Sequence, residues 1–130
     1  DGLGLLDIET VMKPQKRLSQ STATYVPTGD IVTGYEIHIG ETSGSDCNRA
    51  WLSLDGRGEG AASADGRVMG CYLHGLFSAD AFRAAFLAQL DVSLPLTNYT
   101  QGVEDTLDAL ADHLETHMDI DALLGLAGPV

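Results

Sequence analysis

An alternating stretch, IVTGYEIHIGET at residues 31–42, constrains the fold more than any other feature of the sequence. Successive side chains of a strand point to opposite faces of a sheet. One face would carry Ile31, Thr33, Tyr35, Ile37 and Ile39, and the other Val32, Gly34, Glu36, His38 and Gly40. PTGD at 27–30 predicts a turn, and the small and β-branched residues of 17–25 predict a second strand. We therefore expect a half-buried hairpin.

The remaining first half of the chain predicts shorter elements. Residues 3–12, LGLLDIETVM, predict a buried strand that enters a loop at Lys13–Pro14. Residues 43–66 are rich in Gly, Ser, Asp and Ala, so we expect loops with one or two short strands. RVMGCYL at 67–73 predicts a buried strand that ends at His74.

Helices are expected in the last third. Ser78 is a suitable N-cap for a helix over 79–90. Its apolar stripe would consist of Phe82, Ala85, Phe86 and Leu90. After a loop over 91–102, a second helix would carry Val103, Leu107, Leu110 and Leu114 on one face, and 119–128 predicts a short third helix. Strands followed by helices predict an α/β chain in which helices cover a sheet.

Length and charge limit the functional classes. A chain of 130 residues suits one domain or part of a larger one. Its net charge of −12 argues against nucleic acids and anionic membrane surfaces as partners. No stretch approaches the ~20 apolar residues of a membrane span, and the first residues do not resemble a signal peptide. Two cysteines without a CxxC pair favour a reducing, cytoplasmic setting, and the absence of an initiator Met suggests an internal start.

Cys71 and His74 are three positions apart, which raises the question of a nucleophile and its base. In a strand they would point to opposite faces and lie roughly 10 Å apart along the chain. A nucleophile and its base must approach to about 3 Å. We therefore interpret Cys71 as a small buried apolar residue. His74 differs, because an α/β fold exposes catalytic groups where strands end.

The other titratable candidates have simpler explanations. From spacing alone, a surface or satisfied core histidine is the commoner interpretation of His74 as well. His38 shares the polar face of its strand with Glu36, for which a solvated surface is the simplest reading. His113 and His117 are one helical turn apart, but acidic residues surround them, and we expect no metal site. The sequence contains no G-x-x-x-x-G-K-[ST] and no G-x-S-x-G motif.

Four segments together resemble the C-terminal part of cobyric acid synthases, the glutamine-dependent amidating enzymes of cobalamin biosynthesis. They are LGLLDIET at the start, GYEIHIGET at 34–42, SADGRVMGCYLHGLF at 63–77 and DALADHLETHMDIDALL at 108–124. The order and spacing match along essentially the whole chain. The resemblance implies an α/β fold: part of a flavodoxin-like class I glutaminase domain, with a mixed sheet and flanking helices.

The resemblance also implies a reaction. In this family a cysteine on a strand-to-helix elbow attacks the side-chain amide of glutamine, and a histidine is its base. The histidine of YLHG corresponds to His74. The released ammonia amidates carboxylates of adenosylcobyrinic a,c-diamide, and an N-terminal domain binds ATP and Mg. We expect residues 1–130 to be the C-terminal portion of the glutaminase domain, without that elbow, without the ATP-binding domain and without a cofactor of its own.

Two positions depart from the pattern of related enzymes. Cys71 stands where the family commonly has threonine, so it is not the elbow nucleophile. Many class I glutaminases have a Glu two residues after the histidine, where this chain has Leu76, and cobyric acid synthases share that lack. What orients His74 stays open, with Glu36 and His38 as secondary candidates.

Two alternatives and two consequences complete the expectations. The chain could instead belong to a related amidotransferase, such as cobyrinic acid a,c-diamide synthase or a cell-wall amidating subunit. It could also be a glutaminase-like binding module without catalysis. Under the main hypothesis, the isolated chain would be inactive because a base without its nucleophile cannot form the thioester. An incomplete sheet would leave an exposed edge that favours homo-oligomers.

Overall fold

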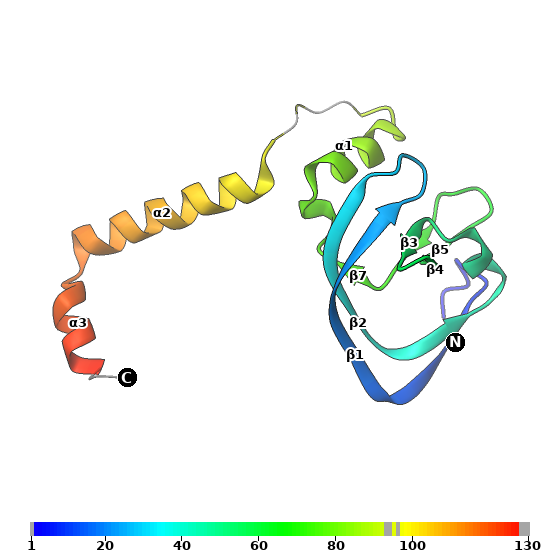
Figure 1. Cartoon of the computed structure of the whole chain (residues 1–130), viewed down its shortest axis with the longest axis horizontal. Helices are drawn as coiled ribbons and strands as arrows, with labels where there is room; N and C mark the ends of the chain where they lie inside the picture. Colours follow the sequence, from blue (N-terminus) through cyan, green and yellow to red (C-terminus); the bar gives the residue numbers. More distant parts are fainter. Residues whose placement is uncertain (1, 93–94, 96, 128–130) are drawn as a thin grey trace. The chain divides into compact units, whose positions relative to one another are not determined.

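The predicted hairpin is the largest element of the structure, a computed structural model that describes residues 2–92, 95 and 97–127. It consists of β1 (Glu9–Tyr25) and β2 (Ile31–Ser43), which pair antiparallel and curve around the shorter strands (Figure 1). The Tyr25 amide donates to the Asp30 carbonyl at 2.8 Å, and Gly29 adopts a φ of 80° that favours glycine. The strands and turn expected over 17–42 are thus confirmed.

The start of β1 differs from the prediction. The strand continues through Lys13–Pro14, where a loop was expected, and the pairing register with β2 shifts between Met12 and Arg17. Proline has no amide to donate to a sheet, which explains an irregularity at this point. Leu3 and Met12 are 91% and 69% exposed, so the predicted burial of 3–12 is wrong. This arm of the hairpin pairs only with β2 among the described strands, because β3 reaches β1 only at residues 23–25. Side-chain contacts across the arm, such as the Lys13–Glu41 ion pair at 3.0 Å, add to that pairing.

Short strands complete two sheets. β3 (Leu52–Leu54), β4 (Arg57–Glu59) and β7 (Leu73–His74) join the hairpin in the order β4-β3-β1-β2-β7. β5 (Ala61–Ala62) pairs with β6 (Met69–Gly70). Of two 3₁₀ helices, η1 (Ser45–Arg49) lies between β2 and β3, and η2 (Leu76–Ser78) follows β7. All pairings among the described strands are antiparallel, and the single strand expected over 67–73 is divided into β6 and β7.

The core lies on one face of the five-stranded sheet, here called the inner face. Its buried side chains come from several strands and include Ala23, Tyr25, Val32, Leu54 and Leu73. The opposite, outer face carries exposed apolar residues: Leu18, Ile31 and Tyr35 are 62%, 60% and 53% exposed. The alternation in the sequence therefore assigned the residues of β2 to the two faces of the sheet correctly. The face rich in isoleucine, however, is the exposed outer face.

Helix α1 (Asp80–Ala88) packs on the core and supplies the expected flanking helix. The Phe82 ring is fully buried and meets Tyr25 edge-on, with ring centroids 5.0 Å apart. Leu90 is 61% exposed and lies beyond the end of α1, so it is not part of the stripe. Ser78 is not the N-cap, since its hydroxyl donates to the Gly75 carbonyl at 2.7 Å within η2. The combination of sheet and helix agrees with the expected α/β class.

The chain divides into two units, 1–96 and 97–130, and the elements described in the second are the helices α2 and α3. α2 (Tyr99–His117) begins inside the segment expected as a loop, because Asn98 caps it by accepting the Gln101 amide at 2.9 Å. α3 (Ile120–Ala127) confirms the third helix, apart from residue 128, which is outside the described residues, as are 93, 94 and 96 of the predicted loop. The predicted apolar face of α2 has no buried residue. None of the helices in the described ranges is both long and apolar enough to span a membrane.

Candidate functional site

His74 ends β7, as the sequence indicated, and the chain turns immediately after it. Gly75 has a φ of 84°, and its carbonyl accepts the Ser78 amide at 3.0 Å. His74 pairs directly with Tyr35 of β2. Residues directly opposite in an antiparallel pair point to the same face, so His74 lies on the outer face with Tyr35. Its side chain is exposed, and within the described part of the chain its ring makes no hydrogen bond.

Gly34 allows β7 to approach β2 closely. A Cβ atom at Gly34 would lie 2.1 Å from the His74 carbonyl oxygen and 3.2 Å from a methyl group of Leu73. No side chain fits at such a distance from main-chain atoms. The glycine therefore sets the position of the segment that presents His74.

Glu36 and His38 lie on the other side of the sheet. Glu36 pairs with Leu73, whose side chain is in the core, and its own side chain is only 2% exposed. His38 is also on the inner face and partly buried. The expectation of a solvated polar face is therefore wrong. The sheet separates both secondary candidates from the ring of His74, and they are not brought together with it.

Glu36 is instead the centre of a network of charges. Arg57 Nη2 donates to Glu36 Oε1 at 2.6 Å, and Arg17 Nε lies 2.7 Å from Glu36 Oε2 in an ion pair that is not aligned as a hydrogen bond. His38 Nε2 is 3.2 Å from Glu36 Oε1. Burial raises the pKa of Glu36, but its interactions with Arg57, Arg17 and His38 outweigh this effect, so the pKa lies below its usual value. Glu36 is thus held as a carboxylate.

The network continues to the segment before His74. Arg57 Nη1 donates to Glu59 Oε2 at 3.0 Å, and Glu59 Oε1 accepts the main-chain amide of Tyr72 at 2.9 Å. The Tyr72 ring stacks on His38, with centroids 4.5 Å apart. Its hydroxyl lies 2.5 Å from the Thr42 hydroxyl.

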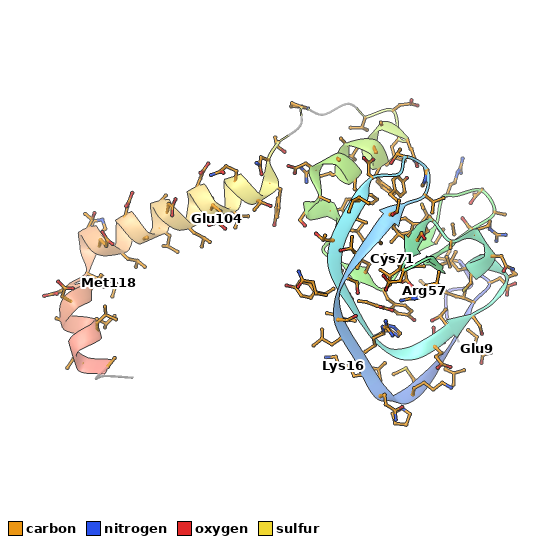
Figure 2. The ribbon with its side chains drawn as sticks, viewed as in Figure 1. Glu9, Lys16, Arg57, Cys71, Glu104 and Met118 are labelled. Carbon is orange, nitrogen blue, oxygen red and sulfur yellow. The ribbon has the colours of Figure 1, made fainter. Side chains whose placement is uncertain are left out.

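A pocket of about 440 Å³ opens beside this network on the inner side. Two of its lining residues, Arg57 and Cys71, are labelled in Figure 2. The lining also includes Glu36, His38, Glu59 and Tyr72. His74 does not line this pocket. The pocket and the exposed histidine are therefore separate features of the same sheet.

Cys71 is poorly suited to be a nucleophile. Burial raises the pKa of its thiol, a backbone hydrogen bond with Leu73 only partly offsets this, and the charge of Glu59 raises it further. A raised pKa disfavours the reactive thiolate. Cys71 also lies on the core side, whereas His74 lies on the outer face. The interpretation of Cys71 as a packing residue thus agrees with its surroundings.

The histidine pair of α2 lies on an exposed helix. The rings of His113 and His117 have centroids 4.4 Å apart, and both residues are exposed. Over the ranges that the structure describes, no three His, Cys, Asp or Glu side chains gather closely enough to hold a metal ion.

Sequence reasoning missed Arg57, Glu59 and Tyr72. A signal was available for the first two, since they follow the Asp55–Gly56 turn two positions apart and so face the same side of a strand. Opposite charges at that spacing suggest an ion pair between two side chains on the same face of one strand. The role of the Tyr72 amide had no such signal, because it depends on a contact with a residue 13 positions away.

Comparisons with known proteins assign the chain to a family. The model of the CobB/CobQ-like glutamine amidotransferase domain matches residues 1–82, which include His74 and the charge network. The chain is 59% identical to a cobyric acid synthase of Rhodobacter capsulatus over 97% of the chain and 26% of that protein. The same name belongs to relatives from Ruegeria sp., 59% identical over 99% of the chain and 27% of that protein, and from Bradyrhizobium diazoefficiens, 54% identical over 97% and 26%.

The chain thus spans about a quarter of the length of these curated relatives. No solved structure matches it. With the family match over more than half of its residues, the chain belongs to the CobB/CobQ-like glutamine amidotransferase domains.

Proposed function

We propose that the chain is the C-terminal portion of the glutaminase domain of a cobyric acid synthase. The observation that carries this proposal is the 54–59% identity to cobyric acid synthases over 97–99% of the chain. Because the identity extends over both the strand and the helical regions, it supports a shared reaction with these relatives and not only a shared fold.

In this proposal His74 is the base of glutamine hydrolysis. It takes a proton from a cysteine thiol, and the thiolate attacks the side-chain amide carbon of glutamine. The imidazolium then gives its proton to the departing nitrogen, so that ammonia leaves and a thioester forms. Water hydrolyses the thioester to glutamate and restores the thiol. The exposed ring of His74 at the end of β7 supports this role, because neither ring nitrogen makes a hydrogen bond to another described residue.

The nucleophilic cysteine would come from outside these 130 residues. Cys71 has a raised thiol pKa and lies on the core side of the sheet. The partner of His74 must reach the outer face, where Leu18, Ile31 and Tyr35 are exposed. The remainder of the glutaminase domain would approach from this side. The isolated chain would accordingly have no glutaminase activity.

The acceptor and its activation belong to the complete protein. We propose that ammonia amidates carboxylates of adenosylcobyrinic a,c-diamide, and that ATP and Mg²⁺, bound outside this chain, activate those carboxylates. Cys47 and Cys71 are both free thiols, which supports a reducing compartment such as the cytoplasm.

The complete protein tests the proposal directly. Incubated with glutamine, ATP, Mg²⁺ and adenosylcobyrinic a,c-diamide, it should release glutamate and yield amidated corrinoid, observed by mass spectrometry. Cobyrinic acid, offered as an alternative acceptor, should not be amidated at its a and c positions. Amidation of those positions, or of a cell-wall precursor instead, would contradict the proposed acceptor.

A further inference from the structure

We propose that Glu59 is a positioning residue for His74, acting through the main chain of Tyr72. The inference rests on the proposed function, in which His74 is the base of glutamine hydrolysis. It assigns a role to a buried carboxylate on a different strand, β4, whose own side chain lies on the inner side of the sheet.

Tyr72 is held at four points. Its amide donates to Glu59 Oε1 at 2.9 Å, and its carbonyl accepts the Ile37 amide at 3.2 Å. Its ring stacks on His38, and its hydroxyl lies 2.5 Å from that of Thr42. No other residue within two positions of His74 has so many contacts among those given for the described chain.

Glu59 is itself fixed by charge. It is 7% exposed, and its other oxygen, Oε2, accepts a hydrogen bond from Arg57 at 3.0 Å. Arg57 in turn donates to Glu36 at 2.6 Å. Glu36 and Leu73 are paired residues of β2 and β7, so the chain of contacts runs from Tyr72, directly before β7, to the strand that pairs with β7 beside His74. Because Arg57 binds both Glu36 and Glu59, this hydrogen-bonded network favours one arrangement of the three side chains.

This support matters because β7 has only two residues. It pairs with β2 alone and forms an edge of the sheet. Pairing over two residues does not by itself fix the direction of the preceding segment, which contains Tyr72. The hydrogen bond from the Tyr72 amide to Glu59 holds that segment on the side away from β2. Displacing a reacting group by about 1 Å can cost roughly 100-fold in rate. Removal of the Glu59 carboxylate should therefore act on turnover through His74.

The test compares variants of the complete amidotransferase in glutamine hydrolysis. We expect Glu59→Ala to lower kcat by about 100-fold with less than about a threefold change in KM, since the proposal has Glu59 act on the position of His74 and not on glutamine itself. Glu59→Gln keeps an oxygen acceptor for the Tyr72 amide and should recover most of this loss. Glu41→Ala is the matched control: Glu41 lines the same pocket, but its side chain is exposed and forms an ion pair with Lys13, so the kcat of this variant should be unchanged.

A double mutant separates positioning from general damage. If Glu59 acts through His74, Glu59→Ala should have no further effect in a His74→Ala background. A further 100-fold loss in that background, or no loss in the wild-type background, would overturn the inference. If Glu59→Ala does not fold, the same comparison with Glu59→Gln decides, with any loss again expected only when His74 is present. Near-normal activity of His74→Ala alone would instead contradict the proposed function.

Discussion

At the scale of single residues, two positions on the inner face of β2, Gly34 and Glu36, need very different side chains. Gly34 must have no side chain, because main-chain atoms of β7 occupy that space. Glu36 must have a charged one, because two arginines converge on it in the interior. Both residues act on the strand that ends in His74, one by close approach and the other by charge.

Gly34→Ala should displace β7. The new Cβ would lie 2.1 Å from the His74 carbonyl oxygen, so the strands must separate. We expect a loss of about 1–3 kcal/mol in unfolding free energy, measured by urea denaturation, and a fall in glutaminase kcat. Gly70→Ala is the control, since a Cβ there meets nothing within 4 Å. Equal stability of the two variants would contradict the close approach of β7.

Glu36 should make stability depend on pH. Because its pKa in the folded chain is below the ordinary value of about 4.3, its stabilisation is complete above that pH and is lost as pH falls through the lowered pKa. Glu36→Gln should lose about 3 kcal/mol at pH 7, and the difference from wild type should shrink towards low pH. Denaturation series at several pH values measure this, with Glu41→Gln as an exposed control. A difference that stays constant with pH would count against the buried carboxylate.

The burial of Glu36 could not be predicted from local sequence. The alternation over 31–42 defined two faces but not which one meets the core, and the isoleucine-rich face was the natural choice. The charges that make burial of Glu36 tolerable, Arg17 and Arg57, come from two other strands. Only the fold reveals that they converge. By contrast, the end of a strand at His74 followed by Gly75 was evident in the sequence.

At the scale of elements, α1 is the helix whose contacts with the sheet are defined. Phe82 is its anchor, with its ring against Tyr25 and Trp51. The helix was predictable from its apolar spacing. Its limits were not, since the chain first forms η2 and the helix ends at Ala88, which leaves Leu90 outside the packed stripe.

Phe82→Ala should therefore be far more damaging than Leu90→Ala. Removing a fully buried ring costs about 3–5 kcal/mol, whereas an exposed leucine contributes within about 0.5 kcal/mol. Thermal or urea unfolding of the two variants gives the comparison. Similar losses would place Leu90 in the core and contradict the observed end of α1.

The short strands were the elements least visible in the sequence. RVMGCYL reads as one buried strand, yet the structure forms β6 and β7 with a break at Cys71 and Tyr72. The break arises because the Tyr72 amide bonds to the side chain of Glu59 instead of a neighbouring strand. Local β-propensity contains no information about such a long-range acceptor.

At the scale of the whole molecule, the described chain leaves apolar surface exposed. Leu18, Ile31 and Tyr35 lie on the outer face, and β7 is a sheet edge. Such surfaces favour association. We expect the isolated chain to self-associate as its concentration rises, measured by light scattering or sedimentation. A monodisperse monomer over the same concentrations would contradict this expectation.

The most direct test of the account is the His74→Ala variant of the complete protein, assayed with glutamine and, separately, with ammonium salt as the nitrogen source. If His74 is the base of glutamine hydrolysis, glutamine-dependent amidation should fall by at least about 100-fold, while amidation from free ammonia stays near the wild-type rate. His113→Ala, which alters an exposed histidine of α2, should leave both rates unchanged. Near-normal use of glutamine by His74→Ala would contradict the assignment of His74.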